Sequence, residues 1–566
     1  MAVGRVLLCL HSHMPYVLSH GKSPHGTDWI NESAAECYVP ILHVLDRLTN
    51  EGIAPRWTMS LTPILVEQLS DESFKHDFES YCLAKIEAAE GDLKRFDAEG
   101  PLWMTGLAAL WHRLYSRTLS QFRNRWNRDL VAAFRHFQDI GAIEIITSGA
   151  THGYLPLLGT DESCRAQLKL GVQTYERHFG RKPRGVWLPE CAYRPAYAWK
   201  SPANDQEVPW MRKGVEELLA ECGLEYFFVD SHMIRGGDPL GTYSDKFPQL
   251  AELFARSSRY FTKPTEFRHE YEHYALHNGV TCFARDPETT VKVWSGDHGY
   301  PGDEHYLEFH KQLYPGRLRY WRISQEKQDL GAKAPYDPYA AFDRIAGHAA
   351  DMASTLKGAL AYYRGLADRE GTLVAMYDTE LFGHWWWEGP QFLYELAKAL
   401  HADGQVTPVT GSDVLDTDPP AHKIALPEGS WGEGGYHYVW LNEDNMWTWK
   451  ALYPAERRMR TMAQSMGKGP AAKIVQQAGR ELLLAESSDW QFQISTKAAK
   501  DYAEVRFADH IKRFNLLADL AEQVHRGQKM TTDDRVFLEE CQQKDAAFPD
   551  LDVTLWAPLA SEAESK

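Results

Sequence analysis

The stretch GTLVAMYDTELFGHWWWEGP, residues 371–390, decides the fold. Its apolar run LVAM is typical of a buried strand, and alternation along a strand places the following Asp378 and Glu380 on one face. A strand that carries acids into an aromatic loop is the way an α/β barrel builds an active site at the C-terminal ends of its strands. Three consecutive tryptophans cannot all face one core, so we expect His384 and Trp385–Trp387 to form a pocket wall rather than ordinary core packing.

The same pattern recurs along the chain, in which short apolar segments end in a histidine or an acid and helical segments separate them. Such alternation predicts a parallel barrel. One pocket should then collect the residues at the strand ends, namely His11, His13, His152, Glu190, Asp230, Asp286 and Asp378. Trp29 falls in the polar segment TDWINE, where we expect a loop.

A chain of 566 residues is too long for a single core, so we expect more than one domain. Residues 1–71 and 140–415 carry the strand–helix alternation and should form the catalytic barrel. Residues 72–139 show helical periodicity with few strand signals, which predicts an inserted helical segment. Residues 416–566 should form a mainly helical C-terminal domain that contributes a Trp-rich loop to the cleft.

The amino-acid composition indicates which kind of ligand the protein binds. The formal net charge is −17, which argues against nucleic acid because its phosphates would repel such a surface. Aromatic residues make up 12% of the chain and include 19 tryptophans. Exposed aromatic rings stack on the apolar faces of sugars, so carbohydrate is the first partner to consider, with a large aromatic core as the alternative.

The termini and cysteines indicate a cytoplasmic protein. We find no signal peptide, and no run of eighteen apolar residues that would predict a membrane span. The eight cysteines include no CxxC pair, which makes a zinc ribbon improbable.

Residue types and spacing leave two chemistries open. In one, two carboxylates cleave a glycosidic bond, with one neutral and one ionised at the start of the reaction. In the other, the His-x-His pair of residues 11 and 13, with an aspartate and a further histidine, binds a divalent metal that activates water.

A resemblance adds to this reasoning. The segments HSHMP, GATHGYLP, WLPECAY and YDTELFGHWW and the SWG…W block resemble, in order, the five sequence regions of glycoside hydrolase family 57. The likeness extends from residue 7 to about residue 450. The segments LLLAESSDWQF and YAEVRFADHIKRF in the C-terminal part are similar to those of the α-1,4-glucan branching enzymes of that family.

The resemblance implies an α/β fold, an incomplete (β/α)7 barrel with an inserted helical segment and a C-terminal helical domain. It implies a retaining mechanism that needs neither metal nor other cofactor. Glu190 matches the nucleophile and Asp378 the general acid/base. The remaining matches are sugar contacts at His11, His13 and His152 and cleft tryptophans at Trp29, Trp294, Trp431 and Trp440.

Two further features concern the residues around the nucleophile. Arg285 and Asp230 are candidates for orienting Glu190, and Arg285 is also a candidate for contact with the substrate. The branching enzymes of the family carry a tyrosine-tipped loop that covers the intermediate, and the corresponding stretch here, 231–280, is long. Tyr243 and Tyr274 are both candidates for that tyrosine.

The function expected from these observations is a 1,4-α-glucan branching enzyme that uses an amylose- or glycogen-like α-1,4-glucan as donor and acceptor. An amylase or 4-α-glucanotransferase of the same family is the alternative, because both depend on the same carboxylates. A metal-dependent, deacetylase-like hydrolase and a non-catalytic glycan-binding protein are alternatives of other classes. We expect a monomer or small homo-oligomer.

Overall fold

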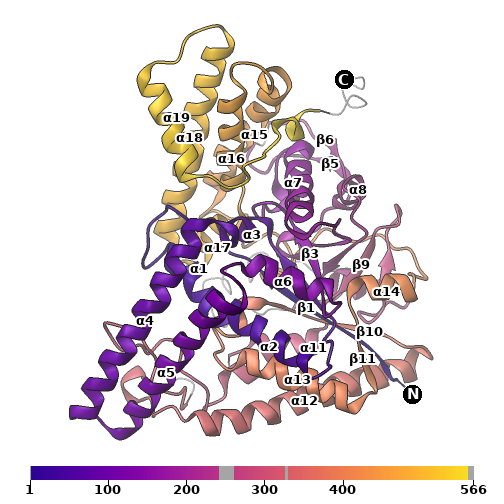
Figure 1. Ribbon diagram of the computed structural model, residues 1–566. Coiled ribbons are helices and arrows are strands. Elements are labelled where there is room, and N and C mark those ends of the chain that lie inside the picture. The colour runs from indigo at the N-terminus through magenta and orange to yellow at the C-terminus, as the bar shows by residue number, and fades with distance from the viewer. Residues whose placement is uncertain (1, 205, 241–260, 297, 326–328, 559–566) are drawn as a thin grey trace.

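The computed structural model describes residues 2–204, 206–240, 261–296, 298–325 and 329–558 (Figure 1). Tyr243 lies outside these residues. The strands of the main sheet are β1 (Gly4–Ser12), β2 (Trp57–Leu61), β3 (Ile143–Ser148), β4 (Gly185–Trp187), β7 (Tyr226–Val229), β8 (Tyr274–Ala275), β9 (Thr281–Ala284), β10 (Thr372–Asp378) and β11 (Val406–Pro408). A separate hairpin consists of β5 (Tyr197–Trp199) and β6 (Trp210–Arg212).

The main sheet curls into an incomplete barrel. Its strand order is β10-β1-β2-β3-β4-β7-β9-β8, with β11 beside β1. The pairings from β10 round to β9 are parallel, and β8 is antiparallel to β9. Beyond the end of β9, Arg285 makes a single parallel bridge to Val374 of β10, and the amide of Asp286 donates to the Val374 carbonyl at 2.8 Å. Among the described residues the sheet thus closes only through this bridge between the end of β9 and β10, which confirms the predicted incomplete (β/α)7 barrel.

The strands are buried on both faces because helices cover the outside of the barrel. These helices are α2 (Val39–Asn50), α3 (Pro63–Ser70), α6 (Leu130–Asp139), α7 (Asp161–Phe179), α8 (Val215–Glu221), α11 (Pro287–Trp294), α12 (Pro338–Ala367), α13 (Gly389–Asp403) and α14 (Gly411–Thr417). Every residue from Thr372 to Tyr377 in β10 is buried, as the continuous apolar run predicts. The four-residue helix α9 (His232–Arg235) follows β7.

Two helical regions project from the barrel (Figure 1). The paired helices α4 (Glu72–Glu99) and α5 (Leu102–Ser120) extend to one side, whereas α6, further along the same stretch, packs against β3. The second region contains α15 (Met446–Met466), α16 (Ala472–Ala485), α17 (Ser488–Thr496), α18 (Lys500–His525) and α19 (Thr532–Lys544). The division into three domains stays a prediction, although both helical regions lie where the sequence pattern placed helices.

The segment between β1 and α2 departs from the predicted loop. Residues of TDWINE form the start of helix α1 (Thr27–Ser33), so Trp29 is helical. A π-helical turn, Ala34–Tyr38, joins α1 to α2. A π-helical turn contains one extra residue, which changes the direction of the neighbouring side chains. In this turn Glu36 and Tyr38 face the loop after β10, as described below.

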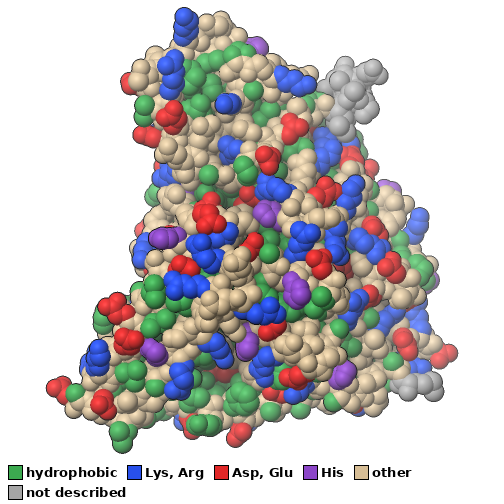
Figure 2. All heavy atoms as spheres, in the orientation of Figure 1, with side chains coloured by type: hydrophobic (Ala, Val, Ile, Leu, Met, Phe, Trp, Pro, Cys, Tyr) green, Lys and Arg blue, Asp and Glu red, His purple; other side chains and the backbone are tan. Residues whose placement is uncertain are grey.

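On the face shown in Figure 2, acidic and basic side chains are interspersed rather than separated into regions of one sign. In the described part of the chain, no helix combines the length and apolar character that crossing a membrane requires.

Candidate active site

The candidate site lies at the C-terminal ends of the parallel strands, where loops from distant parts of the chain meet. His11 lies beside Asp378 in the register of β1 and β10. His152 follows β3, and Glu190 follows β4 in the turn Pro189–Cys191. The structure therefore brings together residues that the sequence pattern placed at successive strand ends.

Two site residues have unusual backbone conformations. Glu190 has φ 60° and ψ 25°, and His152 has φ 59°, both in the left-handed region that non-glycine residues seldom adopt. Such conformations persist only where the surroundings hold them, and they cluster at functional sites. Here they turn both side chains toward the pocket instead of along their strands.

The carboxylate of Glu190 is held by side chains from two remote segments. The indole N–H of Trp431 donates to Oε2 at 2.8 Å, and the Trp431 amide donates to the Glu190 carbonyl at 3.2 Å. The hydroxyl of Ser488, at the start of α17, lies 3.4 Å from Oε1. Trp431 therefore contacts the predicted nucleophile, but its ring is buried and its role as a tryptophan that lines the cleft stays a prediction. Ser488 is a partner that the sequence analysis did not identify.

Burial and the nearby charge of Asp378 raise the pKa of Glu190 to about 8, against the Trp431 hydrogen bond, which lowers it. The charge effect means that the two carboxyl groups are close enough to influence each other. Two interacting carboxyl groups retain one proton between them over a range of pH in which isolated carboxyl groups would both be ionised. The site can therefore hold one neutral and one ionised carboxyl group near neutral pH.

Three imidazoles stack beside the carboxyl groups. The ring centroids of His11 and His152 are 5.0 Å apart, and those of His13 and His152 are 4.1 Å apart. Trp187 closes the stack, with its ring 4.5 Å from that of His11 at an interplanar angle of 5°. Burial is the main cause that lowers the pKa of both His11 and His152, and neighbouring imidazoles add to it. Both rings are therefore neutral at physiological pH.

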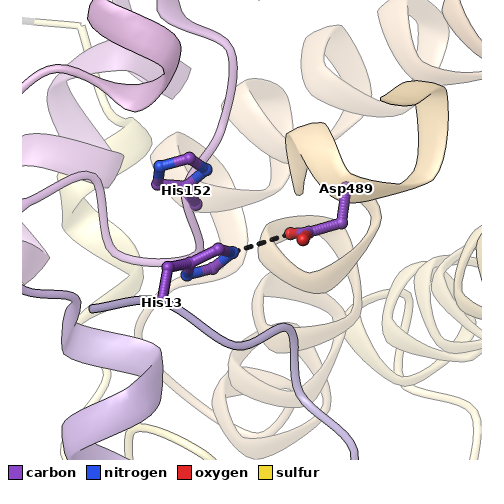
Figure 3. Close-up of side chains that lie close together, drawn as sticks. All are labelled: His13, His152 and Asp489. Carbon is purple, nitrogen blue, oxygen red and sulfur yellow. Dashed lines mark hydrogen bonds and ion pairs between the residues drawn. The ribbon is translucent and has the colours of Figure 1, made fainter. Parts of the chain in front are cut away.

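The C-terminal helices complete this stack (Figure 3). Asp489 of α17 accepts a hydrogen bond from Nε2 of His13 at 2.8 Å, and Ser488 contacts Nδ1 of His152 at 2.9 Å. Burial opposes ionisation of Asp489, but the imidazoles of His13 and His152 bring its pKa down to about 2. Asp489 therefore carries a fixed negative charge beside the histidines.

Sequence reasoning missed Ser488 and Asp489 although the signal was present. The segment LLLAESSDWQF places three polar residues and an acid between an apolar run and an aromatic pair. Buried polar groups of this kind require partners, and the pattern therefore pointed to a polar contact with another part of the chain.

Asp230 and Arg285 support the site from behind. They form a buried ion pair with Nη2 and Oδ2 2.5 Å apart, and the Arg285 guanidinium lies 5.4 Å from the Trp431 ring centroid. Trp294, the last residue of α11, contacts the edge of Trp431 at 5.6 Å. Arg285 therefore positions Trp431, rather than taking the place against a substrate that the sequence analysis assigned to it.

Four other predicted residues lie elsewhere. Trp440 is fully buried and stacks on Tyr154 at 4.6 Å, so the prediction of a cleft platform is wrong. Tyr274 is a buried residue of β8 whose hydroxyl donates to Glu272 at 2.8 Å, so it does not cover the pocket. Asp286 caps α11 by accepting from the Thr289 amide at 2.6 Å, so it is not a pocket acid. Trp29 is half-buried, with its ring 5.6 Å from that of Tyr502, and its role in the cleft stays a prediction.

The loop after β10 is anchored to the π-helical turn. Glu380 accepts hydrogen bonds from the Tyr38 hydroxyl at 2.6 Å and the His13 amide at 3.2 Å. Burial raises the pKa of Glu380 to about 7. Of the three consecutive tryptophans, Trp386 is buried in the core, contrary to the prediction of a pocket wall, and Trp385 is exposed.

Comparison with known proteins bears on this arrangement. A sequence profile described as Glycosyl hydrolase family 57 matches residues 7–427. The chain belongs to glycoside hydrolase family 57. A second profile, described as the C-terminal region of 1,4-alpha-glucan branching enzyme, matches residues 451–556, so it includes Ser488 and Asp489.

Several family 57 members are similar over nearly the whole chain. A 1,4-alpha-glucan branching enzyme of Thermococcus kodakarensis is 39% identical over 96% of this chain and 77% of its own length. The crystal structure of a family 57 branching enzyme from Pyrococcus horikoshii gives a TM-score of 0.87 at 38% identity, covering 98% of this chain and 97% of that one. The alpha-amylase AmyC of Thermotoga maritima gives a TM-score of 0.81 at 30% identity, covering 99% and 100%.

Proposed function

We propose that this protein is a 1,4-α-glucan branching enzyme that acts by two successive displacements with retention at the anomeric carbon. The observation that carries the proposal is the position of Glu190 and Asp378 at the C-terminal ends of parallel barrel strands, with the Trp431 indole bonded to the Glu190 carboxylate. Relatives described as branching enzymes at 38–39% identity over nearly the whole chain support the choice of reaction.

In the form that reacts in the first step, Glu190 is ionised and Asp378 carries the shared proton. Because the pKa of Glu190 is about 8, this is the minor form of the pair at neutral pH. A carboxylate oxygen of Glu190 attacks the anomeric carbon of an α-1,4-linked glucose, while Asp378 gives its proton to the glycosidic oxygen. The bond to that oxygen breaks, the reducing-end part of the glucan leaves, and a glucosyl ester forms on Glu190. The Trp431 hydrogen bond keeps the carboxylate oriented for this attack.

In the second step, Asp378 acts as a base. It removes the proton from the 6-hydroxyl of another glucan chain, whose oxygen attacks the anomeric carbon and expels the Glu190 carboxylate. Two inversions restore the α configuration and leave an α-1,6 branch. The neutral imidazoles of His11 and His152 stack beside the carboxyl groups without adding charge. We place the reaction in the cytoplasm, in line with eight cysteines that are all free thiols.

The test is to incubate the protein with amylose and record the linkages of the product by proton NMR. We expect α-1,6 signals that are absent from the same incubation with Glu190→Gln. New reducing ends without α-1,6 signals would overturn the proposal. That result would favour an α-amylase, the second candidate, which the similarity to the Thermotoga enzyme supports.

The metal-dependent alternative depends on His13, His152 and Asp489, whose ligand atoms lie within 4.8 Å of one another. Both nitrogens of each imidazole already have partners, since His13 also contacts Thr62 at 3.1 Å and His152 contacts His11 at 3.0 Å. A metal ion here would have to displace these bonds. We therefore expect amylose conversion to persist after exhaustive chelation, and a loss that zinc restores would favour the alternative.

A further inference from the structure

The most exposed tryptophan of the molecule lies on the loop that follows Asp378. Trp385 is 52% exposed, and only one other tryptophan, Trp447 at 38%, is similarly open among the described residues, which include all 19. Single exposed rings are common on protein surfaces, so the role of Trp385 has to be argued from the residues that support it and from the loop that carries it. The pocket chemistry described above does not use Trp385.

One face of the Trp385 ring rests on another aromatic side chain. The ring of Phe309 lies 4.6 Å away at an interplanar angle of 30°, and the Arg319 guanidinium lies 5.8 Å from the Phe309 ring. His384 contacts the edge of Trp385 at 5.6 Å. The indole is thus supported from one side and from its edge, which leaves its other face toward solvent.

The backbone that carries Trp385 is fixed. Its amide donates to the Glu380 carbonyl at 3.2 Å, and the next residue, Trp386, is 2% exposed and donates to the Leu381 carbonyl at 2.9 Å. Gly383 has φ 120° and packs so closely on the Glu36 carbonyl that a side chain would not fit. A fixed indole loses little conformational entropy when a ligand stacks on it.

The loop is continuous with the catalytic cleft. Glu380 joins it to His13 through the hydrogen bond to the His13 amide, and His13 in turn contacts Asp489. Asp378, at the start of the loop, is the proposed proton donor to the departing glucan. Trp385 follows Asp378 by seven residues on this anchored loop.

We propose that Trp385, supported by Phe309, is an outer stacking platform for an α-1,4-glucan chain on the Asp378 side of the cleft. The occupant is a glucan because a flat, supported indole matches the apolar face of a pyranose ring and is continuous with a site for which glucan is the proposed substrate. The inference rests on the proposed function. It adds a binding subsite that long glucan chains contact. Short oligosaccharides, which are held in the pocket, do not contact it.

The experiment measures binding without turnover. In a Glu190→Gln background, affinities for amylose and for maltotriose are compared by affinity electrophoresis and titration calorimetry. Trp385→Ala should weaken amylose binding by about 5- to 10-fold and leave maltotriose binding unchanged. Trp385→Phe, which keeps an aromatic face, should retain most of the amylose affinity and show that the loop is intact. The matched control is Tyr362→Ala, which removes a 72% exposed ring on α12.

Failure of the inference and failure of the proposed function give different results. If the Glu190→Gln protein binds amylose and Trp385→Ala binds it as well as Tyr362→Ala does, the platform is overturned and the proposed function stands. If the Glu190→Gln protein itself has no affinity for amylose, both are overturned. A change of oligomeric state in Trp385→Ala, measured by sedimentation, with unchanged amylose affinity would assign the ring to a contact between copies of the chain and overturn the platform.

Discussion

The two carboxyl groups that we propose to be catalytic reach the site in different ways. Asp378 is the last residue of a long buried strand and lies in register beside His11. Glu190 follows a three-residue strand in a left-handed turn, and Trp431 and Ser488, some 240 and 300 positions further along the chain, hold its carboxylate. The comparison shows that a strand end can place a carboxyl group, whereas its ionisation depends on contacts from remote segments.

The strongest test of this comparison is removal of each carboxyl group. Glu190→Gln and Asp378→Asn should each lower branching on amylose by about 10⁴-fold or more, because each has a role in bond cleavage. Their roles separate on a maltoside with an acidic phenol as leaving group, which departs without a proton. Asp378→Asn should still release a burst of phenol from it, and Glu190→Gln should not. The opposite result would exchange the two assignments.

The second test concerns the contribution of the C-terminal helices. Asp489→Asn removes the negative charge beside His13 and should lower kcat/KM by about 100-fold, the effect of losing a charged, buried hydrogen bond. The measurement is steady-state branching with melting temperature recorded alongside. Asp444→Asn, at an exposed position of the same region, should change neither. Full activity of Asp489→Asn would mean that the barrel alone is sufficient.

The third test alters the ionisation of Glu190 alone. Trp431→Phe removes the indole N–H that stabilises the carboxylate, so the pKa of Glu190 should rise above its value of about 8. The shared proton then leaves at higher pH, so the alkaline limb of the pH profile of kcat/KM should move to higher pH by about one unit. The maximal rate should fall about 10-fold. Trp447→Phe, at an exposed position of α15, should leave the limb in place. A limb that moves down would contradict the assignment.

The smallest effect is expected at Tyr274. Tyr274→Phe removes a hydroxyl that bonds to Glu272 in a buried strand, so it should cost about 1 kcal/mol of stability and change the branching rate less than about twofold. Thermal unfolding and linkage analysis by NMR measure both. A loss of branch formation in favour of hydrolysis would restore Tyr274 as a cover of the intermediate. Tyr243 stays the prediction for that role.

The sequence predicts the barrel well because its signals are local. Apolar runs that end in acids or histidines locate β1, β3, β4, β7 and β10, since burial on both faces demands such runs. Trp29 shows the limit of this reasoning, because a polar segment can begin a helix as readily as a loop when its partners are elsewhere.

The site is predictable only in part, for a different reason. Glu190, Asp378 and the histidines sit at strand ends, and the fold alone brings them together. The packing of Trp440 on Tyr154 and the bond of Tyr274 to Glu272 depend on tertiary neighbours, so identity and spacing could not distinguish a buried ring from an exposed one. The polar run that contains Ser488 and Asp489 indicates a buried polar contact, but the identity of its partners depends on how the helical region docks on the barrel.

The placement of Ser488 and Asp489 in α17 has a consequence for biosynthesis. Every barrel strand is translated before residue 409, yet His13 and Glu190 have no partner from α17 until eighty more residues have been added. A nascent chain whose barrel has already folded on the ribosome therefore lacks a finished reaction centre. Folding of the barrel and completion of the reaction centre are therefore separate events in synthesis.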